Sequence, residues 1–136
     1  MQHPAEQQRH TGDLVAAAAV YVLVVVVGFG VGLIGSFSQA ATRTLVGVDL
    51  PVGLVASLVV TLAVIVGAGL STGSRVGAGL AFAGWLLATM VMAVKRPEGD
   101  LVVAATPLGL VWLFGGTVLG GLALAWPYGQ RLRPRR

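Results

Sequence analysis

The stretch LVAAAAVYVLVVVVGFGVGLIGSF, from Leu14 to Phe37, contains no charged residue. A helix over this stretch would reach about 36 Å at ~1.5 Å per residue, which exceeds the ~30 Å hydrocarbon core of a bilayer. Its many valines would favour a strand in water, but an open sheet edge leaves backbone groups unpaired in lipid. We therefore predict a tilted membrane-spanning helix.

Three later stretches are also free of charge, and each is long enough to cross a bilayer. The four predicted spans are residues 14–37, 51–70, 76–94 and 101–126. The expected fold is all-α: a polytopic membrane protein with four transmembrane helices in an antiparallel bundle. This domain, residues 14–126, would lie between a polar tail, residues 1–13, and a basic tail, residues 127–136.

The composition of the whole chain supports a lipid environment. Of its 136 residues, 56% are hydrophobic and only 10% are charged, and the mean hydropathy is +0.87. A soluble domain carries charges at about a quarter of its positions, because water must wet its surface. The chain has no cysteine, which excludes disulfide scaffolds and thiolate metal sites.

The ends of the predicted spans carry residues typical of helix starts and breaks. Asp13 and Asp100 precede spans as anionic caps would, and Pro51 suits a first helical turn. Thr106-Pro107 is expected to kink the fourth helix or delay its start. The break at residues 71–75 is short enough to force a hairpin of helices. The loop at residues 38–50 is longer, and its shape is left open.

The first span has a competing interpretation as a cleaved signal peptide, because residues 38–40 read SQA. The hydrophobic stretch is longer than the roughly 7–15 residues of a signal-peptide core. The segment before it has no net positive charge, since Arg9 is balanced by Glu6 and Asp13. We therefore favour an uncleaved first helix.

Basic residues in the loops predict the orientation, because they remain on the cytoplasmic side. The two sides would hold unequal numbers of them: Arg9, Arg75, Arg131, Arg133, Arg135 and Arg136 on one, and Arg43, Lys95 and Arg96 on the other. We expect a multi-pass protein of a bacterial inner (plasma) membrane with both termini in the cytoplasm. Trp126 and Tyr128 are predicted to anchor the chain at the membrane surface, together with the arginines of the basic tail.

Glycines four residues apart are predicted to form packing notches: Gly28 and Gly32 in the first span, and Gly116 and Gly120 in the last. Such notches let another helix approach closely in lipid, where no hydrophobic force drives helices together. They serve either internal packing, which we favour, or contact with a second copy. Residues 30–35 also match GxGxxG, but that nucleotide-binding pattern needs a strand–turn–helix context that this apolar stretch does not offer.

The densest group of charges, KRPEGD at residues 95–100, lies between the third and fourth spans. Lys95 and Arg96 would end one helix, while Glu98 and Asp100 would precede the next, and both arrangements complement the helix dipoles. We interpret the stretch as a turn, with contact to a partner or a lipid headgroup as the alternative.

Polar residues inside the spans are sparse. The hydroxyl residues either bond within their own helices or line a path for a substrate: Ser57, Thr61, Thr89, Thr106 and Thr117. No Asp, Glu, His, Lys or Arg lies inside the four spans, which argues against proton coupling. His3 and His10 lie in the polar tail and are expected to be solvated. With no catalytic constellation in the sequence, we expect no enzymatic activity, cofactor or metal.

The four spans, the stretch RPEGDLV at residues 96–102 and the arginine-rich end resemble a family of small, uncharacterised four-helix integral membrane proteins of actinobacteria. The resemblance covers residues 14–136 and implies a fold and a location, not a reaction.

The expected function is that of a non-enzymatic accessory or structural component of a membrane assembly. The alternative is a small permeation protein, either a passive transporter or a holin-like pore former. The expected partners are the lipid bilayer and either other membrane proteins or further copies of the chain. We expect no nucleic acid partner, since the basic residues concentrate in a tail, and we identify no small-molecule substrate.

Overall fold

The computed structural model describes residues 4–45, 48–94 and 106–128. Within them, the elements are α1 (Pro4–Ser38), β1 (Arg43–Leu45), β2 (Val48–Leu50), α2 (Val52–Thr72), α3 (Arg75–Ala93) and α4 (Pro107–Ala125). All four helices are long and apolar enough to cross a membrane. The predicted all-α class with four hydrophobic helices is therefore confirmed, with a short β-hairpin added.

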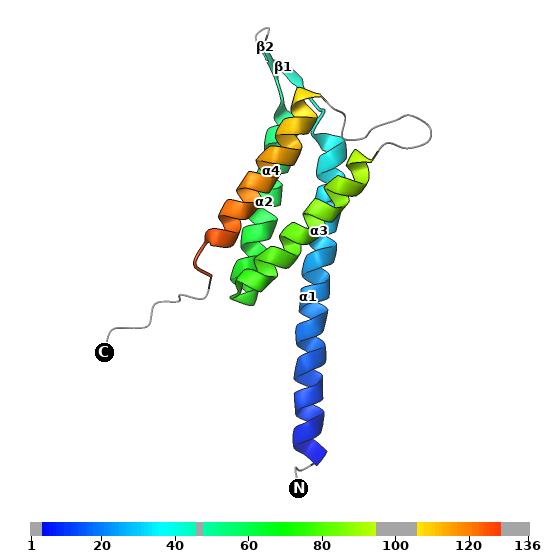
Figure 1. The fold of residues 1–136 in the computed structure, drawn as a ribbon, viewed down its shortest axis with the longest axis vertical. Helices are drawn as coiled ribbons and strands as arrows, with labels where there is room; N and C mark the ends of the chain where they lie inside the picture. Colours follow the sequence, from blue (N-terminus) through cyan, green and yellow to red (C-terminus); the bar gives the residue numbers. More distant parts are fainter. Residues whose placement is uncertain (1–3, 46–47, 95–105, 129–136) are drawn as a thin grey trace, which may run out of the picture.

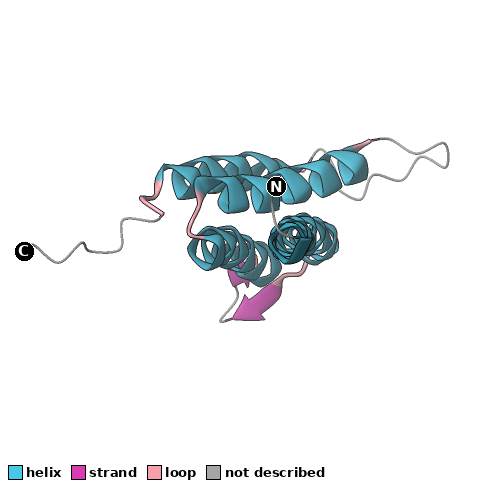
Figure 2. Cartoon of the chain, turned by 90° about the horizontal axis from the view of Figure 1, so that it is seen from below, coloured by secondary structure: helices cyan, strands magenta, loops and turns pink. Residues whose placement is uncertain are grey.

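The helices lie in two layers, with α1 and α2 in one and α3 and α4 crossing them in the other (Figures 1 and 2). The packing is most extensive between α1 and α3, and α2 contacts each of the other helices. The β-hairpin lies at one end of the helices, and the α2–α3 turn lies at the other (Figure 1). The C-terminal end of α4 lies at the same end as the α2–α3 turn (Figure 1).

Glycines bring the backbones of α1 and α3 into direct contact. A Cβ atom at Gly28 of α1 would run into the carbonyl oxygen of Ala81, and one at Gly84 of α3 would run into that of Val25. Gly32, one turn further along α1, also faces the backbone of α3. Two of the predicted notch glycines thus lie at a contact inside the chain, where any side chain would separate the helices.

The structure corrects the predicted start of the first helix. That helix begins at Pro4, so Asp13 lies inside α1 and does not cap it. Helix propensity explains the extension, because the polar segment PAEQQRH is rich in residues that favour helices. Most of the segment predicted as a polar tail, residues 1–13, is therefore helical.

The other helix ends also differ from the predicted spans. Pro51 is the N-cap of α2 and not part of its first turn. The break at residues 71–75 shrinks because α2 continues to Thr72 before Gly73 ends it in the left-handed conformation, with φ of 59°. Ser74 then caps α3, its hydroxyl accepting a hydrogen bond from the backbone N–H of Val76.

The fourth helix starts later than residue 101. Thr106 is its N-cap, with its hydroxyl accepting from the Gly109 N–H at 3.2 Å, and Pro107 is the first helical residue. The delayed start expected from Thr106-Pro107 is confirmed, because proline suits a first turn, where its missing N–H costs nothing. Residues 101–105 lie outside the described residues.

The loop between α1 and α2 contains an antiparallel hairpin. Arg43 pairs with Leu50 and Thr44 with Asp49. The Thr44 hydroxyl also donates a 2.6 Å hydrogen bond to the Asp49 carboxylate. The hairpin pairs its own backbone groups, which is the cheapest way for a polar loop to lie beside apolar helices.

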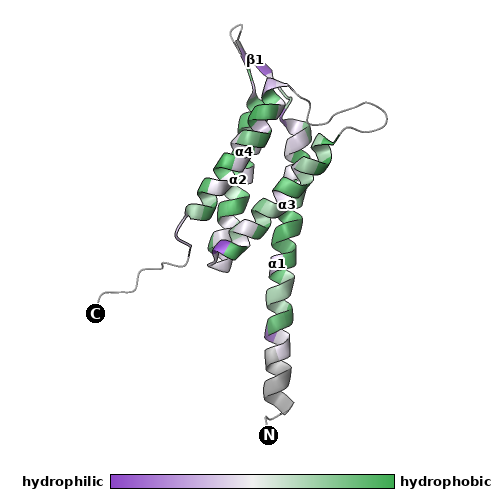
Figure 3. Cartoon of the chain, in the orientation of Figure 1, coloured by the Kyte–Doolittle hydropathy of each residue, from purple (hydrophilic) through white to green (hydrophobic). Residues whose placement is uncertain are grey.

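All four helices carry large hydrophobic side chains that are exposed. Hydrophobic residues fill most of the length of the helices, whereas hydrophilic residues concentrate at the hairpin and the α2–α3 turn (Figure 3). The helix α1 extends well beyond that turn (Figure 1). Residues 11–20 of α1 are exposed throughout, including Leu14 at 60% and Val15 at 64%. The described residues therefore leave the apolar residues 14–20 of α1 exposed.

We predict that Gly28→Ala destabilises the fold by about 1–3 kcal/mol, because the added methyl group overpacks the contact between α1 and α3. Unfolding midpoints of the detergent-purified protein measure the loss. Gly30→Ala is the matched control, since a Cβ atom at Gly30 meets nothing within 4 Å. Equal losses in the two variants would contradict the close contact.

Candidate functional site

The centre of the helical interior is an aromatic cluster of Phe82, Trp85 and Trp112. The Phe82 and Trp85 rings are stacked with centroids 5.8 Å apart, and Trp85 meets Trp112 edge to face at 5.4 Å. Both tryptophans are fully buried, and neither indole N–H has a hydrogen-bond partner among the described residues. The cluster joins α3 to α4 by shape and area, not by polar bonds.

The predicted notch in α4 receives these rings. A Cβ atom at Gly116 would collide with the Trp85 ring, and one at Gly120 would collide with Phe82. The rings thus occupy the notch where the prediction expected another helix to approach. Gly35 was not among the predicted notch glycines, but it lies against the Trp112 ring in the same way. The only feature of the sequence that singled out Gly35 was its place as the last glycine of the GxGxxG match.

Most of the hydroxyls in the helices bond to their own backbone. Thr89 donates to the carbonyl of Trp85 at 3.0 Å and Thr117 to that of Leu113 at 2.7 Å. Both bonds span one turn, as expected for a hydroxyl with no other partner. They do not line a path, because Thr89 is fully buried and Thr117 faces outward.

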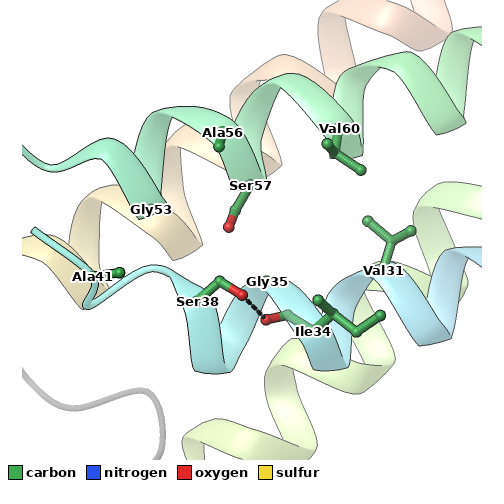
Figure 4. Close-up of a pocket in the computed structure, with 9 residues that line it drawn as sticks. All are labelled: Val31, Ile34, Gly35, Ser38, Ala41, Gly53, Ala56, Ser57 and Val60. Atoms are coloured by element: carbon green, nitrogen blue, oxygen red, sulfur yellow. Dashed lines mark hydrogen bonds between the residues drawn. The ribbon is translucent and has the colours of Figure 1, made fainter.

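Two hydroxyls one turn apart on α2 differ from this pattern. Thr61 is 2% exposed, and its hydroxyl has no hydrogen-bond partner among the described residues. Ser57 is 8% exposed, and its hydroxyl points into a cavity between α1 and α2 (Figure 4). Two further polar residues are buried near the end of α1, and neither was among the predicted site residues: Ser36 and Gln39.

Two cavities lie along the contact between α1 and α2. The hairpin-side cavity measures about 260 Å³ and is lined by Val31, Ile34, Gly35, Ser38, Ala41, Gly53, Ala56, Ser57 and Val60 (Figure 4). The turn-side cavity measures about 290 Å³ and is lined by Leu23, Val24, Val27, Val64, Gly67, Ala68 and Ser71. Both linings are almost entirely apolar, so each cavity suits hydrocarbon better than water or an ion.

Two of the predicted membrane-surface anchors, Trp126 and Tyr128, have different surroundings. Trp126 is 58% exposed beyond the end of α4. Tyr128 instead folds back, with its ring against Gly69 of α2 and its hydroxyl donating to the Ala123 carbonyl at 2.7 Å. Burial raises the pKa of Tyr128 above its ordinary value, so this donor keeps its proton to a higher pH than an exposed tyrosine would. Tyr128 therefore connects α4 to α2.

The remaining candidate residues lie outside the described part of the chain. They are the turn residues Lys95, Arg96, Glu98 and Asp100 and the tail arginines Arg131, Arg133, Arg135 and Arg136. Among the described residues, no three His, Asp or Glu side chains gather as a metal site would require.

A protein-family model described as "Family of unknown function (DUF6113)" matches residues 6–127. The chain belongs to this family. The DUF6113 match covers all four helices except the first two residues of α1, and it agrees with the expected family of uncharacterised proteins. No curated protein and no solved structure matches the chain.

We predict that Tyr128→Phe lowers the free energy of unfolding by about 0.5–1.5 kcal/mol, because it removes the hydrogen bond to the Ala123 carbonyl. Tyr128→Ala should cost more, since it also empties the contact with Gly69. The difference between wild type and Tyr128→Phe should disappear as the pH rises through the raised pKa of Tyr128, where the hydroxyl loses its proton.

Chemical denaturation in detergent micelles measures these effects. Trp126→Leu is the control, and its effect should stay within about 0.5 kcal/mol, as is usual for an exposed position. A Tyr128→Phe variant as stable as wild type would show that the hydroxyl contributes nothing.

Proposed function

We propose that the chain is an integral protein of the inner (plasma) membrane of a bacterium, specifically an actinobacterium. Its four helices would cross the bilayer as an antiparallel bundle. The proposal is supported by four hydrophobic helices whose outer faces are apolar and whose polar residues concentrate at the two ends. The arginine-rich tail and Arg75 favour a cytoplasmic location for both termini and for the α2–α3 turn.

Within that membrane, we propose a non-enzymatic role as an accessory or structural component of a larger assembly. The observation that carries this proposal is the length of α1. Its candidate span is 28 residues long, against 21, 19 and 19 for the other three helices. At ~1.5 Å per residue, the candidate span within α1 is about 10–14 Å longer than the other three.

The excess length of α1 is apolar and uncovered. Gly28 meets Ala81, which lies only six residues into α3, so the apolar residues before about residue 22 extend past the start of α3. A bilayer matched to the shorter helices leaves this length mismatched, at a cost of fractions of a kcal/mol per Å. Packing against a helix of another membrane protein would remove that cost.

The alternative, a small permeation protein, has weaker support. The aromatic cluster closes the interior, and the buried hydroxyl of Thr89 bonds to its own backbone and so does not offer itself to a substrate. The two cavities lie between α1 and α2 with apolar linings, which resist the passage of ions and water.

The orientation predicts which positions an impermeant maleimide reaches in intact cells. The chain is free of cysteine, so single substitutions report directly. We expect Thr42→Cys, next to the hairpin, to be labelled and Ser74→Cys, in the α2–α3 turn, to be labelled only after the membrane is permeabilised. The reverse pattern would overturn the orientation, and labelling of both in intact cells would overturn the bundle.

The accessory role predicts that the tagged protein purifies from mild detergent with other membrane proteins. Charged substitutions on the exposed part of α1, such as Val15→Glu, should release them. The matched control is Leu122→Glu on the exposed face of α4. Isolation of the wild type as a lone monomer would contradict the proposal, and depolarisation of cells on induction would favour permeation instead.

A further inference from the structure

The hairpin-side cavity combines an apolar lining with one unsatisfied hydroxyl. The Ser57 side chain is only 8% exposed, and its hydroxyl points into the cavity (Figure 4). It makes no hydrogen bond with the described residues. Ser38 lies across the cavity but already donates to the Ile34 carbonyl at 2.7 Å (Figure 4). Ser57 is therefore the free donor of this site.

The size of the cavity matches a single hydrocarbon chain. A methylene group fills about as much space as a water molecule, ~30 Å³, so 260 Å³ holds roughly eight or nine of them. A helix, at about 10–12 Å across with its side chains, is too wide for a slot between two helices that contact each other. A second copy would also need about 800 Å² of surface, which one such slot does not supply.

The entrance to the cavity faces the side of the bundle. Ile34, 68% exposed, and Val60, 50% exposed, stand at its rim. Both belong to helices apolar enough to span a membrane, so the medium at the entrance would be lipid. Ser57 lies five residues after Val52, about 8 Å along α2 from its hairpin-side end. It therefore lies in the leaflet on the hairpin side, and the ester oxygens of that leaflet are the lipid oxygens nearest to it.

We propose that the hairpin-side cavity binds one acyl chain of a membrane phospholipid, with the Ser57 hydroxyl donating a hydrogen bond to an ester oxygen of that lipid. This rests on the proposed membrane location. Val31 and Val60, which face each other at the end of the cavity away from Gly53 and Ala41 (Figure 4), would contact the chain. The hydroxyl distinguishes this site from the turn-side cavity, where Ser71 already bonds to the Ala68 carbonyl at 3.1 Å.

Photo-crosslinking in lipid vesicles tests the proposal. The full chain is reconstituted into vesicles of phosphatidylethanolamine and phosphatidylglycerol that contain a phospholipid with a diazirine in one acyl chain. After irradiation, mass spectrometry locates the crosslinks. We expect residues 31–38 and 53–60 to be labelled several-fold more than Val118 and Leu122, which are equally exposed to lipid on α4.

Three variants refine the test. Ala56→Leu fills the cavity and should reduce this labelling about fivefold or more. Ala63→Leu is the matched control on the same helix, because Ala63 is exposed and lines neither cavity, and it should leave the labelling unchanged. Ser57→Ala should lower the lipid-bound fraction seen by native mass spectrometry about 2- to 10-fold, the loss expected for one hydrogen bond.

The outcomes separate the inference from the proposed function. The lipid site would be overturned if the labelling followed exposure alone, or if it fell equally in Ala56→Leu and Ala63→Leu. Either result would leave the membrane location intact. No labelling anywhere, with the protein extracted by alkaline carbonate, would overturn both. Efficient disulfide dimers of Val60→Cys would show that a second copy covers the cavity and would also overturn the lipid site.

Discussion

The backbone contact between α1 and α3 is the constraint on which the rest of the structure depends. In a hydrocarbon medium, helices gain nothing by hiding apolar side chains from one another, so association relies on close packing and a few hydrogen bonds. Gly28 and Gly84 remove the side chains that would keep the two backbones apart. Dispersion contacts fall steeply with distance, so a gap of even half an ångström would forfeit much of this energy.

Tight packing on one side of α1 leaves looser packing on another. The same helix that meets α3 through glycines meets α2 through valines and isoleucine, whose branched side chains hold the two helices apart at two places. The hairpin then joins α1 to α2, and a Cβ atom at Gly53 would collide with the Ser38 carbonyl. The cavities therefore follow from the packing, since α1 cannot move toward α2 without leaving α3.

The sequence predicted the elements well and their ends less well. Charge-free stretches identified all four helices, because in lipid the absence of charge is a strong signal. The predicted fourth span began at residue 101, and the Thr106-Pro107 pair indicated either a kink or a later start, of which the structure has the later start. The prediction that Asp13 caps the first helix was wrong, because the segment before Asp13 also favours a helix and the helix continues through it. The hairpin was not predictable, since its short pairing depends on the positions of α1 and α2.

Some of the site residues were predictable from the sequence, and others were not. Glycine spacing singled out Gly28 and Gly32, but spacing alone does not say which helix or ring fills a notch. The aromatic cluster was not visible, because Trp85 and Trp112 meet only through tertiary packing. The cavity was not visible either, since a cavity is a property of the space between two helices and no residue type marks it.

The hydroxyls of α2 show why that space bears on function. An unsatisfied buried polar group costs about 1–3 kcal/mol, and a bilayer interior has no water to satisfy it. Elsewhere in the helices the cost is avoided, as when Thr89 donates to the carbonyl one turn back. Ser57 has the same kind of carbonyl within its own helix but directs its hydroxyl into the cavity instead. A group held in a costly orientation beside an empty apolar space is stabilised when a molecule with an oxygen at that depth enters. Under the proposed membrane location, the abundant molecule that carries such an oxygen is the lipid, which would make the cavity left by the packing of α1 a place where the bilayer completes the fold.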